Sequence, residues 1–187
     1  MIAERPNEEL SGANSKLALF ERALLPHLNA AYNLARWITE NDQDAEDMVQ
    51  EAYLRALKPF DGFHGGDGRP WLLVIVRNTC CTWLRQNGSK ELTTPLGEEI
   101  HKPEGEKFSP EALLRRSAEI ELLKKALQEL ALEFREVLIL GELEGLSYKQ
   151  IAAIVGLPIG IVMSRLARAR TQLRKRYAKS SSLEEKR

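Results

Sequence analysis

The stretch SYKQIAAIVGLPIGIVMSRLARARTQLRKRY, residues 147–177, predicts two helices joined by a tight turn. Ser147 and Gln150 have the spacing of a capping box, in which each side chain accepts a hydrogen bond from the backbone N–H of the other residue. The first helix should therefore begin at Ser147. It should end at Gly156, because glycine readily closes a helix in the left-handed conformation and Pro158 cannot continue it.

The second helix of this stretch should run from residue 159 or 160 to residue 177. Apolar residues recur along one side of it, which predicts a buried stripe formed by Val162, Leu166, Ala169 and Leu173. The opposite side carries small or basic residues, namely Ser164, Ala167, Arg168 and Thr171, flanked by Arg165 and Arg170. This pattern is typical of a helix-turn-helix motif that binds DNA.

Charge is separated by sign along the chain. Lys and Arg together number 27, as do Asp and Glu, so the net charge is zero. Residues 145–183 nevertheless contain no acidic residue and include the basic residues Lys149, Arg165, Arg168, Arg170, Arg174, Lys175, Arg176 and Lys179. A polyanion is the natural partner of such a segment. The alternative is a helical hairpin with a solvated basic side.

The balancing negative charge gathers in residues 40–57, ENDQDAEDMVQEAYLRAL, which predict a helix. Its inner side should consist of Met48, Val49, Ala52, Tyr53 and Ala56. Its outer side should carry Asp47, Gln50, Glu51 and Leu54. Taken alone, this segment favours a solvated acidic helix over the other interpretation, a docking surface for a basic partner.

A glycine-rich loop, FDGFHGGDGRP at residues 60–70, follows that helix and lacks the pattern of a phosphate-binding P-loop. A helix should then span residues 71–86, with polar groups at Arg77, Asn78, Thr82 and Arg85. Trp71 and Trp83 fit core or core-rim positions better than base-stacking positions. Cys80 and Cys81 are adjacent, so neither a zinc site nor a disulfide framework is indicated. Both should be small buried helix residues of a protein in a reducing cytoplasm.

The remaining pattern is helical as well. Residues 1–14 should form a disordered lead-in, followed by helices over residues 16–25 and 26–38, the second burying Leu28, Ala31, Tyr32 and Ala35. Further helices are predicted over residues 111–130, after an N-cap at Ser109, and over residues 132–143. The predicted fold is all-α, with helical domains at 14–88 and 111–179 joined by a flexible, Pro- and Gly-containing linker at 89–110.

Several classes of protein are disfavoured. The three His residues are scattered, and no protease, hydrolase or kinase signature is present, so we expect no enzyme, metal or cofactor. The first residues are charged rather than apolar, and no apolar run reaches membrane-spanning length. We therefore expect a cytoplasmic protein without a membrane partner.

Three segments together resemble the extracytoplasmic-function (ECF) group of bacterial sigma factors in the sigma-70 family. They are DAEDMVQEAYLRAL, the glycine loop with WLLVIVRNTCCTWLR, and ELEGLSYKQIAAIVGLPIGIVMSRLARAR. The resemblance covers about residues 15–177 and includes the order of the segments. It implies a dissociable subunit of RNA polymerase that directs transcription initiation at promoters, catalyses nothing itself and in many relatives is held inactive by an anti-sigma factor.

The resemblance also implies the roles of individual residues. The first domain would bind the clamp helices of core polymerase through Asp47, Gln50, Glu51 and Leu54, which changes the interpretation of the acidic helix from solvated to functional. It would bind and melt the −10 element through Gly62, Phe63, His64, Trp71, Asn78 and Thr82. The second domain would bind the polymerase flap and read the −35 element through Met163, Ser164, Arg165, Ala167 and Arg168. Its contacts to the DNA backbone would come from Lys149, Arg170 and Arg174.

This chain departs from the family pattern in the recognition helix and in the glycine loop. Met163 stands where many members have Lys or Arg, and Ile161 where Thr is usual, so Ser164 and Arg168 should carry more of the base recognition. The glycine loop is about one residue shorter than in some members. A free-standing dimeric helix-turn-helix regulator is the alternative, and the acidic helix and the separate first domain argue against it.

Overall fold

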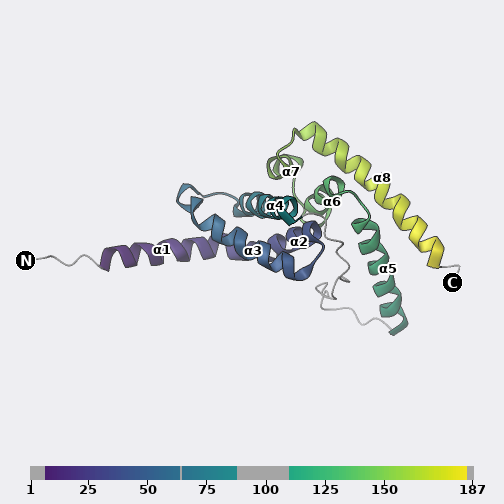
Figure 1. The fold of residues 1–187 in the computed structure, drawn as a ribbon, viewed down its shortest axis with the longest axis horizontal. Coiled ribbons are helices and arrows are strands. Elements are labelled where there is room, and N and C mark those ends of the chain that lie inside the picture. Colours follow the sequence, from purple (N-terminus) through teal and green to yellow (C-terminus); the bar gives the residue numbers. More distant parts are fainter. Residues whose placement is uncertain (1–6, 64, 88–109, 185–187) are drawn as a thin grey trace, which may run out of the picture.

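The structure is a computed structural model that describes residues 7–63, 65–87 and 110–184. All regular elements in these ranges are helical, as the sequence predicted (Figure 1). They are α1 (Asn7–Leu24), η1 (Leu25–His27), α2 (Leu28–Thr39), α3 (Asp42–Leu57), η2 (Pro59–Gly62), α4 (Gly68–Asn87), α5 (Pro110–Gln128), α6 (Leu132–Leu138), η3 (Ile139–Leu143), α7 (Tyr148–Val155) and α8 (Ile159–Glu184). None of these helices is by itself long and apolar enough to cross a membrane; only α7 and α8 taken together pass that test, across a bend of 100°.

The first bundle consists of α2, α3 and α4, which pack against one another around small and branched side chains. Ala31, Ala35, Ala52 and Ala56 are fully buried, and such short side chains allow the helix backbones to approach closely. α1 reaches this bundle only near its end, where Phe20 and Leu24 are buried, and the rest of α1 extends away from it (Figure 1).

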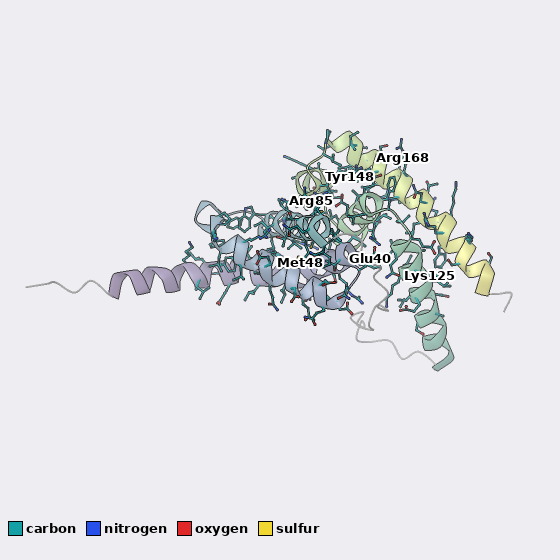
Figure 2. All side chains as sticks on the ribbon, viewed as in Figure 1. Glu40, Met48, Arg85, Lys125, Tyr148 and Arg168 are labelled. Atoms are coloured by element: carbon teal, nitrogen blue, oxygen red, sulfur yellow. The ribbon has the colours of Figure 1, made fainter. Side chains whose placement is uncertain are left out.

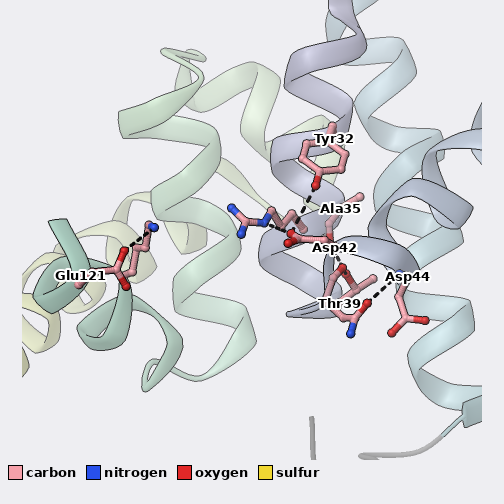
Figure 3. A network of polar contacts seen from close by, with 9 residues as sticks. Tyr32, Ala35, Thr39, Asp42, Asp44 and Glu121 are labelled. Atoms are coloured by element: carbon pink, nitrogen blue, oxygen red, sulfur yellow. Dashed lines mark hydrogen bonds and ion pairs between the residues drawn. The ribbon is translucent and has the colours of Figure 1, made fainter. Parts of the chain in front are cut away.

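Polar contacts fix the turn between α2 and α3, which sets the direction of the acidic helix (Figure 3). Asn41 caps α3 by accepting a hydrogen bond of 3.0 Å from the backbone N–H of Asp44. Asp42, in the first turn, pairs with Arg36 and accepts a hydrogen bond of 3.3 Å from the hydroxyl of Tyr32. Carboxylates in this position favour the positive end of the helix dipole, as the sequence predicted.

The second bundle holds α7 and α8 against α5 and α6. The predicted capping box is present: Oε1 of Gln150 accepts from the backbone N–H of Ser147 at 2.9 Å, and the Ser147 hydroxyl accepts from the N–H of Gln150 at 3.3 Å. Gly156 ends α7 with a φ of 70°. The predicted stripe of α8 is buried at Val162, Leu166 and Ala169 and partly buried at Leu173.

The structure corrects three details of the predicted helices. α1 begins at Asn7 rather than near residue 16, since no proline interrupts the chain between Asn7 and Leu25. Leu28 is 44% exposed because Pro26 sits in η1 and α2 begins only at Leu28, so Leu34 and Ile38 supply the larger core side chains of α2. α8 continues seven residues past Tyr177 to Glu184, again without an intervening Gly or Pro. The predicted linker lies outside the described residues, apart from its last position, Pro110, which begins α5.

Gly68 supports a tight contact between α4 and the end of α1. A Cβ atom there would lie 2.8 Å from the carbonyl oxygen of Ala23 and 3.2 Å from a methyl group of Leu24. We expect Gly68→Ala to lower the free energy of unfolding of the first bundle by about 1–3 kcal/mol, because the backbone must move apart. Urea denaturation followed by circular dichroism measures this.

Gly160→Ala is the matched control for Gly68→Ala. A Cβ atom at Gly160 meets no atom within 4 Å, and the residue lies in a helix. Its substitution should be neutral or should stabilise by roughly 0.4–1 kcal/mol through the unfolded chain. Equal effects of the two substitutions would contradict the packing argument.

Candidate polymerase and nucleic-acid interface

The outer side of α3 presents acidic and apolar groups to solvent together. Asp47 and Gln50 are exposed, and Leu54 is 63% exposed, which is unusual for a leucine in a packed helix. Glu51 is partly exposed and pairs with Arg55 one turn on, Nε to Oε1 at 2.7 Å. This outer side therefore combines a negative surface with an unburied apolar side chain, as docking surfaces do.

An aromatic cluster anchors the glycine loop to the first bundle. The ring of Phe63 stacks on Phe60 with centroids 5.6 Å apart and contacts Trp71 at 5.3 Å. Beyond the cluster, Gly65 and Gly66 have φ values of 85° and 109°, which side-chain-bearing residues rarely adopt. The loop is thus held firmly at its aromatic base and bends where two glycines allow it.

The predicted −10 residues are only partly brought together. Asn78 is exposed on α4, and Thr82, one turn on, donates its hydroxyl proton to the carbonyl of Asn78 at 2.8 Å. Trp71 is half-buried in the aromatic cluster, in agreement with the core-rim position that its sequence context favoured. Gly62 is exposed at the start of the loop, and His64 lies outside the described residues.

The outer side of α8 is open to solvent where the sequence placed the −35 contacts. Met163 is 51% exposed, and Ser164, Ala167 and Arg168 are exposed as well. Among the residues that the structure describes, no ion-pair partner is found for Arg168, which Figure 2 labels on α8. A guanidinium of this kind is available for a bidentate contact with a base or a phosphate.

Two other arginines of α8 are engaged within the protein. Arg165 pairs with Glu133 at 2.9 Å and lies 3.9 Å from Glu136. Arg170 pairs with Glu142, with nitrogen–oxygen distances of 2.6 and 2.8 Å. Sequence reasoning missed these contacts, because the acidic partners lie 28 to 32 residues earlier in the chain.

The two helical bundles contact each other directly, with α4 against α7 and α2 against α6. Arg135, Glu136 and Glu144 of the second bundle are all buried, at 4%, 3% and 6% exposure. Each has an oppositely charged partner in the first bundle, in the pairs Glu40–Arg135, Arg77–Glu136 and Arg69–Glu144. Buried charges are tolerated when they are paired in this way.

The pair between Arg77 and Glu136 is bidentate. Nε of Arg77 donates to Oε2 of Glu136 at 2.7 Å, and a terminal nitrogen donates to Oε1 at 3.1 Å. Burial alone would lower the pKa of the Arg77 guanidinium, but the hydrogen bond and the charge of Glu136 outweigh burial and raise that pKa. The same carboxylate is within reach of Arg165, so Glu136 lies between arginines of α4 and α8.

Further polar contacts join the starts of α4 and α7. Oδ1 of Asp67 accepts from the backbone N–H of Arg69 at 3.1 Å, and Oδ2 accepts from the side-chain amide of Gln150 at 3.1 Å. The residue that completes the capping box of α7 therefore also contacts the glycine loop. Asn33 of α2 adds a hydrogen bond of 3.1 Å to Glu144.

An apolar groove of about 450 Å³ lies between α5 and α8. Its walls are formed by Glu119, Ile120, Leu123, Leu173, Arg174 and Tyr177. Arg174, predicted as a DNA-backbone contact, is thus an exposed residue at the edge of this groove. Lys149, another such residue, is exposed in the first turn of α7, at the end of this helix away from Gly156.

Comparison with known proteins identifies both bundles. Residues 24–90 match the family model described as Sigma-70 region 2, and residues 120–173 match Sigma-70, region 4. The ECF RNA polymerase sigma factor SigE of Mycolicibacterium smegmatis is 32% identical over 174 residues, which cover 93% of this chain and 67% of SigE. The RNA polymerase sigma factor YlaC of Bacillus subtilis is 34% identical over 147 residues, covering 76% of this chain and 82% of YlaC.

A solved structure supports the same assignment. The sigma factor RpoE of Bartonella quintana, in complex with the anti-sigma factor NepR, matches with a TM-score of 0.66 and 30% identity, covering 84% of this chain and 95% of RpoE. The chain therefore belongs to the ECF group of the sigma-70 family, the sigma factors of bacterial RNA polymerase. The family is one of transcription initiation factors, as the resemblance in the sequence implied.

The two adjacent thiols of α4 differ in environment. Burial, to which the neighbouring Cys81 adds, raises the pKa of the Cys80 thiol to about 12. Burial also raises the pKa of Cys81, which is only partly covered.

Because the thiolate is the nucleophile, we expect iodoacetamide at pH 8 to modify the native chain at least about tenfold more slowly than the denatured chain, and Cys80 more slowly than Cys81. Tandem mass spectrometry of the alkylated peptide measures both rates, and equal native and denatured rates for Cys80 would refute this expectation.

Proposed function

We propose that this sigma factor binds core RNA polymerase through α3 and the groove between α5 and α8, and promoter DNA through α4 and α8. The observation that carries the proposal is the exposed outer side of α8, where Ser164, Ala167 and Arg168 face solvent without an acidic neighbour along the helix. The rest of the molecule supplies two further surfaces of suitable chemistry, one acidic and one apolar.

The acidic side of α3 is the proposed contact with the polymerase clamp helices. Asp47, Gln50 and Glu51 offer carboxylates and an amide to a basic partner, and Leu54 offers an apolar group that burial in a complex would stabilise. The apolar groove lined by Leu123 and Leu173 is the proposed contact with the flap, because such a groove suits the apolar side of a helix.

The −10 element is assigned to the glycine loop and the exposed side of α4. The aromatic base of the loop and its two left-handed glycines suit a pocket for an extruded base, since they allow close backbone approach. Asn78 supplies an exposed amide that can pair with a base edge.

The −35 element is assigned to Met163, Ser164, Arg165, Ala167 and Arg168, with Lys149, Arg170 and Arg174 on the DNA backbone.

Regulation by an anti-sigma factor is part of the proposal. The Bartonella RpoE structure contains such a partner, and its similarity extends over more of this chain than either family segment covers. Control by an anti-sigma factor would tie promoter use to a signal.

We expect Asp47→Lys and Glu51→Lys each to weaken the complex with core polymerase by at least about tenfold, because a charge reversal turns attraction into repulsion. A native gel shift with purified core enzyme measures the affinity. Glu21→Lys, at an exposed position of α1, is the matched control and should bind normally. Normal binding by both α3 variants would rule out the proposed clamp contact.

We expect Arg168→Ala to weaken promoter binding by the polymerase–sigma holoenzyme and to relax base preference at one −35 position by about 1–3 kcal/mol. Arg170→Ala should leave the base preference unchanged, because its guanidinium is held by Glu142. The measurement is holoenzyme binding to a library of −35 variants at two salt concentrations. If Arg168→Ala leaves the base preference unchanged, Arg168 contacts only phosphates and does not read a base.

A further inference from the structure

Arg69 and Arg77 are cations of α4 that the assignments above leave without a role. They are eight residues apart, which is about 12 Å along a helix, and Arg77 directly precedes Asn78. Both guanidinium groups are partly covered, at 29% and 20% side-chain exposure. They therefore lie beside the surface of α4 that we assign to the melted −10 strand, but they do not face solvent freely.

What covers these arginines is a pair of carboxylates from the other domain. Glu144 meets Arg69, and Glu136 meets Arg77 through two parallel hydrogen bonds. A carboxylate that accepts from both arms of a guanidinium imitates the way a phosphate is held, because the arginine fork has the same geometry for either anion. Carboxylates of the second domain thus stand where a DNA backbone phosphate would fit.

We propose that Arg69 and Arg77 bind backbone phosphates of the melted promoter strand, and that Glu144 and Glu136 occupy this phosphate site while the two domains are in contact. The inference rests on the proposed role of α4 at the −10 element. DNA and the second domain then compete for the same two arginines, so single-strand binding requires the domain contact to open.

The competition gives the two partners of each ion pair opposite effects on DNA binding, which a purely structural ion pair would not. Removing a carboxylate unmasks the site and should strengthen binding, since the apparent affinity rises with the fraction of open molecules. Removing an arginine should weaken binding and reduce its salt dependence, because the log–log slope on a single strand falls by about 0.7 for each phosphate that is no longer neutralised.

The test uses the full-length chain and a fluorescein-labelled single strand of about twelve thymidines, followed by fluorescence anisotropy at several salt concentrations. Glu136→Gln/Glu144→Gln should bind about fivefold or more tightly than the unmodified chain. Each single substitution should act in the same direction, so the result does not depend on the double variant. Glu21→Gln removes a carboxylate charge from an exposed position of α1 and should change nothing.

The arginines are then tested in the unmasked background. Adding Arg69→Gln/Arg77→Gln to the double glutamine variant should abolish the gain and lower the salt slope by about 1.4. Small-angle X-ray scattering on the same samples should show a larger radius of gyration once the carboxylates are removed. Unchanged affinity in the glutamine variants, or an unchanged salt slope after the arginines are removed, overturns the inference.

A separate measurement distinguishes failure of this inference from failure of the proposed function. If α4 does not contact melted DNA at all, Asn78→Ala will leave promoter opening by the holoenzyme intact in permanganate footprinting. If only the masking argument is wrong, Asn78→Ala will impair opening while the arginine and glutamate variants bind the single strand as the unmodified chain does.

Discussion

Glu136 carries a negative charge at 3% exposure, and the contact between the two domains depends on keeping that charge paired. Water no longer solvates this carboxylate, so a cation must balance its charge. Arg77 of the other domain is that cation and donates two hydrogen bonds to Glu136. Removing one partner of a buried pair typically costs about 3–5 kcal/mol, because the remaining charge stays desolvated. The pair therefore does more to specify how the domains meet than to stabilise their contact, since the net gain from a complete pair is small.

The features that sequence predicted well are local ones. The capping box at Ser147, the left-handed Gly156 and the buried stripe of α8 each depend on residues within one or two turns, and the structure confirms all three. The predicted start of α1 was wrong because the helix continues through Gly12 and the polar residues around it, back to Asn7. The predicted end of α8 was wrong because no Gly or Pro follows Tyr177 to stop the helix. Leu28 was expected to be buried from its spacing alone, but the 3₁₀ turn around Pro26 delays the start of α2.

The sequence could predict those residues of the candidate site that are exposed to solvent, but not those that form contacts with distant parts of the chain. Asp47 and Arg168 follow from a charge pattern on one side of a helix, and both are exposed. The neighbours of Arg77 and Arg69 could not be foreseen, because their partners lie 59 and 75 residues further along the chain and periodicity carries no information about pairing at that range. The contact of Arg170 could not be foreseen either, since the glutamate of η3 that pairs with it lies 28 residues earlier in the chain.

The two domains that meet through these buried charges belong to one polypeptide. Their contact is a unimolecular equilibrium, so the fraction of molecules in which it is formed does not change when more of the protein is made. A separate inhibitor behaves differently, because its occupancy follows the ratio of free inhibitor to its dissociation constant. Raising the amount of this sigma factor would titrate such an inhibitor away and leave the intramolecular contact as it was. Because the two domains are covalently connected, a higher gene dosage does not change the fraction of molecules in which they are in contact. A ligand that competes for the same charges lowers that fraction.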